Sequence, residues 1–325
     1  MTYTLNDMTR REFLRTAGLI VGGATLAGAA GPLTAQAQAP RVGIARNTAV
    51  WGDGGLDPHL LGRLIDEAVM WAVGEDTPEK AWAKCFSADE VVGLKPNGIA
   101  GYELSTLPET ISHCVDRLEG VGIPRDHVIV WEQNPGHLAA CGVPLDDIPW
   151  GVRAVPTDSN LGEPVRNGSF SDRLCTVLDE CDAFVNLPIL KDHSVSGVTA
   201  AMKNHYGSIG NPGAQHAEIH QKIVDLNDLP QIKDKTRLVI CDMVHTVVDG
   251  GPFGAPHYFP GAMLATTDFV ACDAVCWYVI EEERARRGIP TLKDSGREPL
   301  HIAGAQERGL GVADLGRINV NVIDL

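Results

Sequence analysis

The chain is poor in basic residues: 27 Lys and Arg stand against 42 Asp and Glu over 325 residues, a formal net charge of −15. Such an acidic surface would repel phosphate backbones and anionic lipid, so nucleic acid and anionic membranes are not expected as partners. After the N-terminal segment, no apolar run approaches the roughly twenty residues of a membrane span. Repeats and heptads are also missing. These absences favour a globular protein with a small-molecule ligand, and a local basic pocket could still hold an anion.

The N-terminal segment has the three regions of a bacterial export signal. A paired Arg10-Arg11 precedes Phe13-Leu14 and a mild apolar run, and small residues follow at Ala35-Gln36-Ala37. The arginine pair favours the twin-arginine route, which resembles a system that exports proteins already folded, often with a cofactor inserted. We therefore expect a signal peptide over residues 1–37, a periplasmic mature chain without stable membrane insertion, and the twin-arginine export machinery as a partner.

No Cys-x-x-Cys-x-x-Cys run is present among the eight cysteines, so an iron–sulfur cluster of ferredoxin type is not expected. Cys241 lies in an apolar run, and Cys272 and Cys276 are four residues apart on a predicted helix. A protein that folds before export completes its core in a reducing compartment. Most of these cysteines are therefore expected to be buried thiols rather than disulfides.

Short apolar runs alternate with amphipathic stretches along the chain, a pattern typical of parallel α/β layers. We predict an α/β fold with a mostly parallel sheet and helices on both faces, in one domain or two lobes. The expected strands cover residues 42–45, 91–94, 128–131, 152–155, 183–187 and 238–241. The expected helices cover residues 58–72, a short segment from Thr77, and residues 106–118, 174–178 and 267–283.

The main domain is expected to cover residues 38–287. Residues 156–170, rich in Ser, Asn, Gly and Pro, indicate a surface loop or a boundary between lobes. Residues 288–325 are expected to form a small C-terminal α/β appendage with two short strands around a Gly-rich loop.

Polar residues follow four of the predicted strands. In parallel α/β sheets ligands bind at the carboxyl ends of strands, so these residues are expected to share one edge. They are Lys95 with Asn97, Glu132 with Asn134, Asn186 leading to Lys191, Asp192 and His193, and Asp242 with His245.

The segment 186–220 is the densest in chemically active side chains, and it supplies most of the predicted site. Its lysines could hold an anion near a Gly-rich turn, and burial could lower a lysine pKa enough for proton abstraction. The predicted catalytic residues are Lys191, His193, Lys203 and His205. The predicted cofactor-binding residues are Lys95, Asn97, Asn186, Asn204, Gly250 and Gly251, the last two from a Gly-Gly-Pro run.

His216 and His220 would share one face of a helix at i, i+4, a spacing that suits two imidazoles on one metal. With Asp242 as a further ligand they form a predicted site for a divalent metal. The alternative is a solvated helix face that carries two histidines.

Several of these segments, in order, resemble the domain-of-unknown-function family 362. The motifs are Lys95-Pro96-Asn97, the Asn-Leu-Pro-x-Leu-Lys-x-His element over 186–193, a Gly-x-Thr-x-x-x-Lys-Asn-x-x-Gly element over 197–207, Gly-Pro-x-Gly over 251–254 and Asp-x-x-x-x-Asp over 268–273. The resemblance spans roughly residues 42–281. Many members carry ferredoxin-like cysteines, which this chain lacks, so electron transfer is not implied here. A weaker likeness is to the nickel-pincer lactate racemase group, in which Lys203 and either His216 or His220 would match the cofactor-anchoring lysine and the nickel ligand.

The leading hypothesis is an exported enzyme that acts on a small oxygenated, anionic metabolite. Its lysines would hold the anion, a histidine would serve as base, and a metal could act as Lewis acid. Isomerase, redox and lyase chemistry all remain open. The competing hypothesis is a non-catalytic periplasmic protein that binds a ligand or delivers a cofactor.

Overall fold

The structure is a computed structural model that describes residues 39–325. The predicted twin-arginine motif and cleavage site lie outside these residues. Within them, no helix combines the length and the apolar character needed to cross a membrane.

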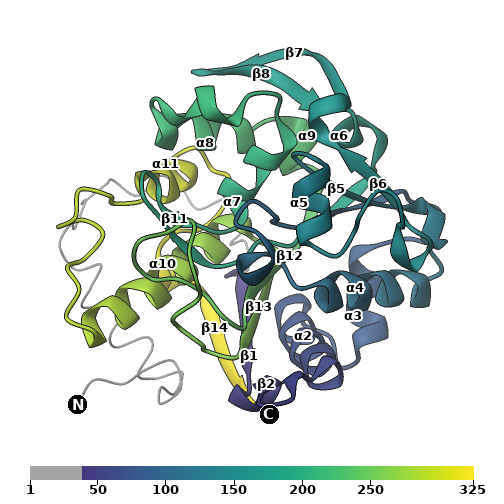
Figure 1. Ribbon diagram of the computed structural model, residues 1–325, viewed down its shortest axis with the longest axis horizontal. Coiled ribbons are helices and arrows are strands. Elements are labelled where there is room, and N and C mark those ends of the chain that lie inside the picture. Colours follow the sequence, from purple (N-terminus) through teal and green to yellow (C-terminus); the bar gives the residue numbers. More distant parts are fainter. Residues whose placement is uncertain (1–38) are drawn as a thin grey trace, which may run out of the picture.

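A twisted sheet of eight strands forms the centre of the molecule, in the order β14-β1-β13-β12-β9-β4-β5-β6 (Figure 1). The strands from β12 to β6 are parallel, whereas β13 is antiparallel to both β12 and β1. The strands are β1 (Arg41–Arg46), β4 (Val92–Lys95), β5 (Val128–Glu132), β6 (Arg153–Pro156), β9 (Ala183–Asn186), β12 (Thr236–Met243), β13 (Ala262–Thr266) and β14 (Asn319–Asp324). The predicted α/β class with a mostly parallel sheet is confirmed.

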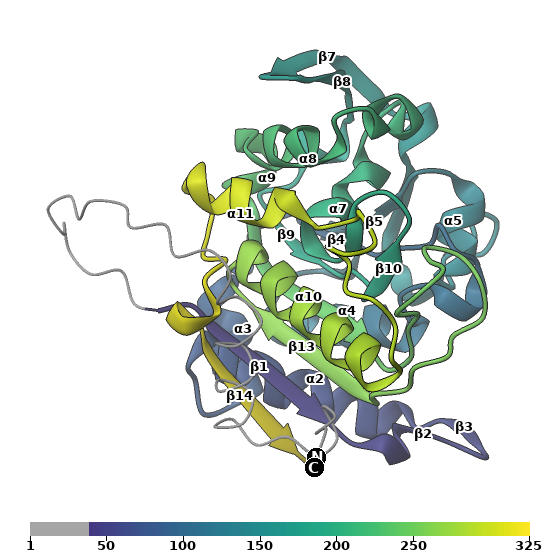
Figure 2. The ribbon, with the colours of Figure 1, turned by 90° about the vertical axis from the view of Figure 1, so that its left-hand side faces the viewer.

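Helices cover both faces of this sheet (Figure 2). On one face, α2 (Pro58–Val73), α3 (Pro78–Cys85) and α4 (Pro108–Gly120) bury an apolar cluster against the strands. On the other face, a second cluster lies under α10 (Phe269–Arg286) and α8 (Ile219–Asn227). Both faces of the strands are therefore dry, as parallel sheets require.

The two longest helices begin where the sequence provides caps. The Asp57 side chain accepts hydrogen bonds from the backbone N–H groups of the first turn of α2, and Pro58 follows it. The Asp268 side chain does the same for α10. These caps explain why both helix starts could be predicted from the sequence.

The C-terminal segment is part of the main sheet rather than an appendage. Of its two predicted strands only the second forms: α11 (Leu300–Glu307) takes the place of the first, and β14 pairs in parallel with β1. The pairing partner of β14 is β1, which lies 273 residues or more away along the chain. Such a distant pairing cannot be predicted from the local sequence pattern.

Two other segments also differ from the expectation. Residues 156–170 open a ribbon of β7 (Leu161–Asn167) and β8 (Phe170–Cys175), so the helix predicted at 174–178 begins only at α6 (Val177–Glu180). After this ribbon the chain returns to the same sheet as β9.

Candidate functional site

The carboxyl ends of β4 and β9 are adjacent, with Lys95 opposite Asn186 in the register. The Asn204 amide joins them: its Nδ2 donates to the Lys95 carbonyl at 2.7 Å and to Asn186 Oδ1 at 2.8 Å. Asn97 Nδ2 donates to Asn204 Oδ1 at 2.9 Å. Asn204 ends α7 (Ala201–Asn204), so these buried amides fasten this short helix to the edge of the sheet.

Lys95 and Glu132 form a buried ion pair beneath this network, with 3.2 Å between Nζ and the nearer carboxylate oxygen. Burial by itself raises the pKa of Glu132. The Lys95 ammonium, His137 and the N–H groups of Gly98 and Gln133 outweigh burial and hold that pKa at about 2. Gly207 packs on the pair, since a Cβ there would lie 2.6 Å from Lys95 Nζ. The charge of Lys95 is thus already balanced.

A cavity of about 340 Å³ is lined by Glu132 of this ion pair but not by Lys95. Segments distant in sequence line it: the loops after β4 and β5, the hairpin of β10 (Lys191–His193) and β11 (Gly197–Thr199), α7, and the turns around residues 206–216 and 252–253. Its polar and charged lining residues include Asn97, Glu132, Gln133, His137, Lys191, His193, Thr199, Lys203, Asn204, Tyr206 and His216. The structure therefore brings most of the predicted lysines and imidazoles together in one cavity.

Lys191 and Lys203 face this cavity, and neither forms an ion pair with a carboxylate within residues 39–325. Lys191 Nζ donates to Asn97 Oδ1 at 2.8 Å. Lys203 Nζ lies 3.5 Å from the centre of the Tyr206 ring, a cation–π contact. Burial lowers the pKa of both amines to about 7; the Glu132 carboxylate opposes the shift at Lys191, and Lys191 adds to the shift at Lys203. Burial therefore favours the neutral form of both amines more than in water.

Two imidazoles of the cavity wall, His193 and His216, differ in tautomer. His193 Nδ1 accepts from the backbone N–H groups of Val195 and Ser196 at 3.1 and 3.2 Å, so its proton is assigned to Nε2. His216 Nδ1 lies 2.9 Å from the Pro212 carbonyl oxygen, so it carries the proton and leaves Nε2 as an acceptor. Burial and the Lys203 ammonium lower the pKa of both rings, that of His193 to about 3. One ring can thus donate a hydrogen bond, and the other can accept a proton.

His205, predicted to be catalytic, does not line the cavity. Its ring is buried, with Nδ1 3.3 Å from Ser208 Oγ. Burial and the Lys95 charge lower its pKa to about 3. His205 therefore packs in the structure that supports the site and is not part of the cavity wall.

The predicted metal site of His216, His220 and Asp242 is not formed. Glu218 has a left-handed backbone (φ 55°) that separates the turn carrying His216 from α8, so the i, i+4 helix face does not exist. His220 Nδ1 lies 3.2 Å from His301 Nδ1 instead. The Asp242 carboxylate accepts backbone N–H groups of the loop after β12 and of the start of α4. Within residues 39–325, one group of three His, Cys, Asp or Glu ligands lies within 4.8 Å, and it contains none of these residues.

The Gly250-Gly251 run shapes the cavity wall from outside. Gly251 N–H donates to Asp192 Oδ2 at 2.9 Å, and a Cβ at Gly251 would lie 2.1 Å from the Asp192 carbonyl oxygen. Gly250 is exposed, and the next residues, Pro252 and Phe253, line the cavity. These glycines allow close packing of the loop on β10.

Asp273 is a supporting residue whose role the sequence left open. It is fully buried, and its carboxylate accepts the backbone N–H groups of Ala201 and Met202, at 2.6 and 3.2 Å. Both groups belong to the first turn of α7, which carries Lys203. Its position in α10, five residues after the Asp268 cap, could be predicted from the sequence, but the direction of its side chain could not.

A family model described as a domain of unknown function, DUF362, matches residues 92–278, more than half of the chain. The chain belongs to this family. The range matched in this DUF362 protein includes all the residues that line the cavity. A search of curated protein sequences finds no match.

Two solved structures show distant likeness to this DUF362 chain. A protein from Thermotoga maritima is 9% identical with a TM-score of 0.37, and the match covers 56% of this chain and 53% of that one. The lactate racemase apoprotein from Thermoanaerobacterium thermosaccharolyticum is 10% identical with a TM-score of 0.37, covering 74% and 57% respectively. The chain thus spans little more than half the length of each. Likeness at this level transfers no reaction to this chain.

Replacing Lys203 by Met should stabilise the protein by about 1–4 kcal/mol near neutral pH, since an apolar side chain of similar length removes a buried charge without a carboxylate partner. The pKa of Lys203 falls from 10.5 to about 7 on folding. Between these values the unfolded chain binds more protons than the folded one, so wild-type stability rises with pH across this range. Below pH 7 Lys203 is protonated in both the folded and the unfolded chain, so the full cost of burying its charge lowers the free energy of unfolding.

Urea unfolding from pH 6 to 10 measures both effects. Lys203→Met should reduce the rise and leave the share of Lys191, whereas Lys293→Met, at a lysine whose side chain is 72% exposed, should retain the whole rise. A Lys203→Met protein that is less stable than wild type at pH 6 would contradict this prediction, because it would show that the charge of the Lys203 amine is compensated in the folded protein.

Proposed function

We propose that this DUF362 protein is an enzyme that binds a small oxygenated anion in the cavity and transfers a proton on it. The observation that carries the proposal is the pair of buried amines, Lys191 and Lys203, that face one cavity without carboxylate partners among the described residues. Burying an ammonium group is costly unless an opposite charge compensates it. A carboxylate or phosphate in the cavity would supply that charge.

The neighbouring groups suit the same ligand. The assigned Nε2–H of His193 is a further donor, and the apolar side chains of Ile99, Val195 and Phe253 complete the wall. A cavity of about 340 Å³ is at the small end of ligand pockets, which favours a metabolite of a few carbon atoms. An anion would also raise the pKa of each amine and so secure its own counter-charge.

Proton transfer follows from the division of roles between the cavity groups. His216 Nε2, or an amine of Lys191 or Lys203 in its neutral form, would take a proton from a carbon next to the bound carboxylate. The electron pair of the broken C–H bond would move onto the carboxylate oxygens, where an ammonium and His193 stabilise the negative charge. Return of the proton to the same carbon completes the cycle without oxidant or metal. Reactions that begin with this step include isomerisation and elimination.

Calorimetry with a panel of small carboxylates, together with inorganic phosphate, tests the binding step. Affinity for the best anion should fall as the pH rises through 7, because both ammonium groups lose their protons there. Lys203→Met should weaken binding by about 10-fold or more, the usual loss for a charge-assisted contact.

Proton NMR in deuterated water tests the chemical step on the anions that bind. The C–H group next to the carboxylate should exchange with solvent, and His216→Ala should slow exchange with affinity retained. His59→Ala, which changes an exposed histidine of α2, is the control. An anion that binds tightly but shows no C–H exchange, in the wild type and in His216→Ala alike, would instead support a non-catalytic ligand carrier.

We further propose that the chain is exported by the twin-arginine route to the periplasm, on the support of the motif at Arg10-Arg11. Replacing both arginines by Lys in the full chain should retain the protein in the cytoplasm of a producing bacterium. Fractionation measures this, with Arg41→Lys as control outside the motif. Unchanged periplasmic recovery of the double variant would contradict the proposal.

A further inference from the structure

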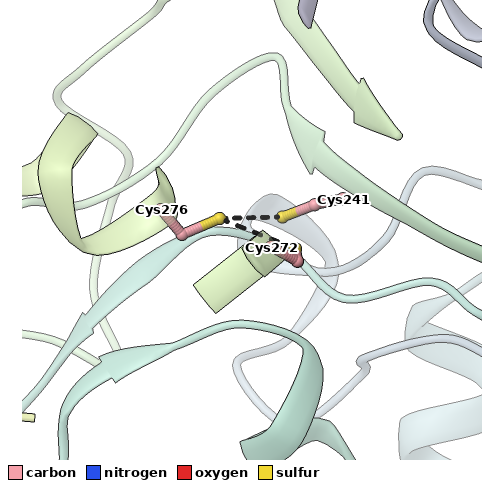
Figure 3. A group of neighbouring side chains, drawn as sticks. All are labelled: Cys241, Cys272 and Cys276. Carbon is pink, nitrogen blue, oxygen red and sulfur yellow. Dashed lines mark hydrogen bonds between the residues drawn. The ribbon is translucent and has the colours of Figure 1, made fainter. Parts of the chain in front are cut away.

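A cluster of three cysteine thiols lies in the core between the sheet and α10, away from the cavity. Cys241 comes from β12, and Cys272 and Cys276 come from successive turns of α10. All three are fully buried, and none lines the cavity. Figure 3 shows their sulfur atoms pointing toward one another from the two elements.

We propose that Cys241, Cys272 and Cys276 bind one monovalent copper ion. The Sγ atoms of Cys241 and Cys276 are 3.8 Å apart, those of Cys272 and Cys276 are 4.0 Å apart, and all three lie within 4.8 Å of one another. Thiolates bound to one metal at about 2.3 Å are separated by about 4 Å in a trigonal arrangement. An ion could therefore enter between the sulfur atoms with little movement of the backbone.

The ligand set selects the metal. Thiolates are soft ligands that favour Cu(I) and zinc over hard cations. Structural zinc takes four ligands, and the group contains three. Water cannot be the fourth, because all three side chains are fully buried. Monovalent copper accepts three thiolates in a plane and requires no fourth ligand.

The chemistry of loading is a proton exchange. One Cu⁺ ion binds three sulfur atoms and releases up to three thiol protons, and no electron is transferred. Three bound thiolates leave a net negative charge in the core, with Cys272 and Cys276 at the fourth and eighth residues of α10. Burial raises the pKa of the Cys241 and Cys272 thiols, so we expect their protons to leave only as the copper ion takes their place. The other described cysteines are not part of this group of three.

Anaerobic titration of the reduced full chain with Cu(I), in competition with the chelator bicinchoninate, tests the proposal. Because the cluster is buried, the ion is also supplied during refolding from urea. Wild type should bind one copper per chain, develop ultraviolet thiolate-to-copper absorption and unfold at a higher temperature. Cys276→Ala should lower copper affinity by roughly 100-fold or more, since loss of a ligand should exceed the loss of an outer partner.

Cys114→Ala is the matched control, because it removes an equally buried thiol from α4 outside the cluster and should retain copper binding. If Cys276→Ala fails to fold, the copper-dependent rise in the unfolding temperature of wild type still decides the matter. Absence of that rise after refolding with Cu(I) would overturn the proposal. So would equal copper affinity in folded Cys276→Ala, or retention of zinc in preference to copper.

Discussion

Two buried lysine amines that form no ion pair with a carboxylate among the described residues are the constraint on which this site depends. Lys95 is balanced by Glu132, so the third lysine of the region adds no net charge. Lys191 and Lys203 are held by an amide oxygen and an aromatic ring, which compensate a positive charge only in part. The fold therefore maintains a small cavity in which the positive charge of two amines is compensated only in part, although the chain as a whole is acidic. The net charge of the chain is negative, whereas the amines of Lys191 and Lys203 add positive charge to the cavity. Solvent screens the distant surface charges, so the nearby amines dominate the electrostatic potential inside the cavity.

The scaffold holds these amines by satisfying nearly every other polar group around them. Three asparagine amides link α7 to the ends of β4 and β9, and the Asp273 carboxylate accepts the first N–H groups of the same helix. A helix of four residues has little stability of its own, so these bonds determine where Lys203 lies. Some groups of the wall are still left without partners in the described chain, among them Thr199 Oγ1 and Gln133 Oε1. Unpaired buried polar atoms in a cavity wall are consistent with a ligand that would pair them.

Much of this arrangement could be predicted because it follows local rules. Strands that end in Lys95, Glu132 and Asn186 are parallel, so their ends meet at one edge whatever the details of the loops. Helix caps at Asp57 and Asp268 are equally local. The predicted metal site was wrong for a reason that sequence periodicity cannot reveal. The left-handed backbone of Glu218 interrupts the helix that would have placed His216 and His220 on one face. The role of Asp273 and the pairing of β14 with β1 depend on contacts between distant segments, which one sequence does not encode in any simple pattern.

The most direct test of this account is the titration of the two amines themselves. Nitrogen-15 NMR of the folded protein with labelled lysine, with Lys191→Met and Lys203→Met spectra for assignment, would follow each side-chain nitrogen from pH 5 to 11. Both amines should titrate near pH 7 in the free protein and shift upward when a cavity anion binds. Titration of both near the ordinary value of 10.5, with no response to any anion, would contradict a buried cationic cavity.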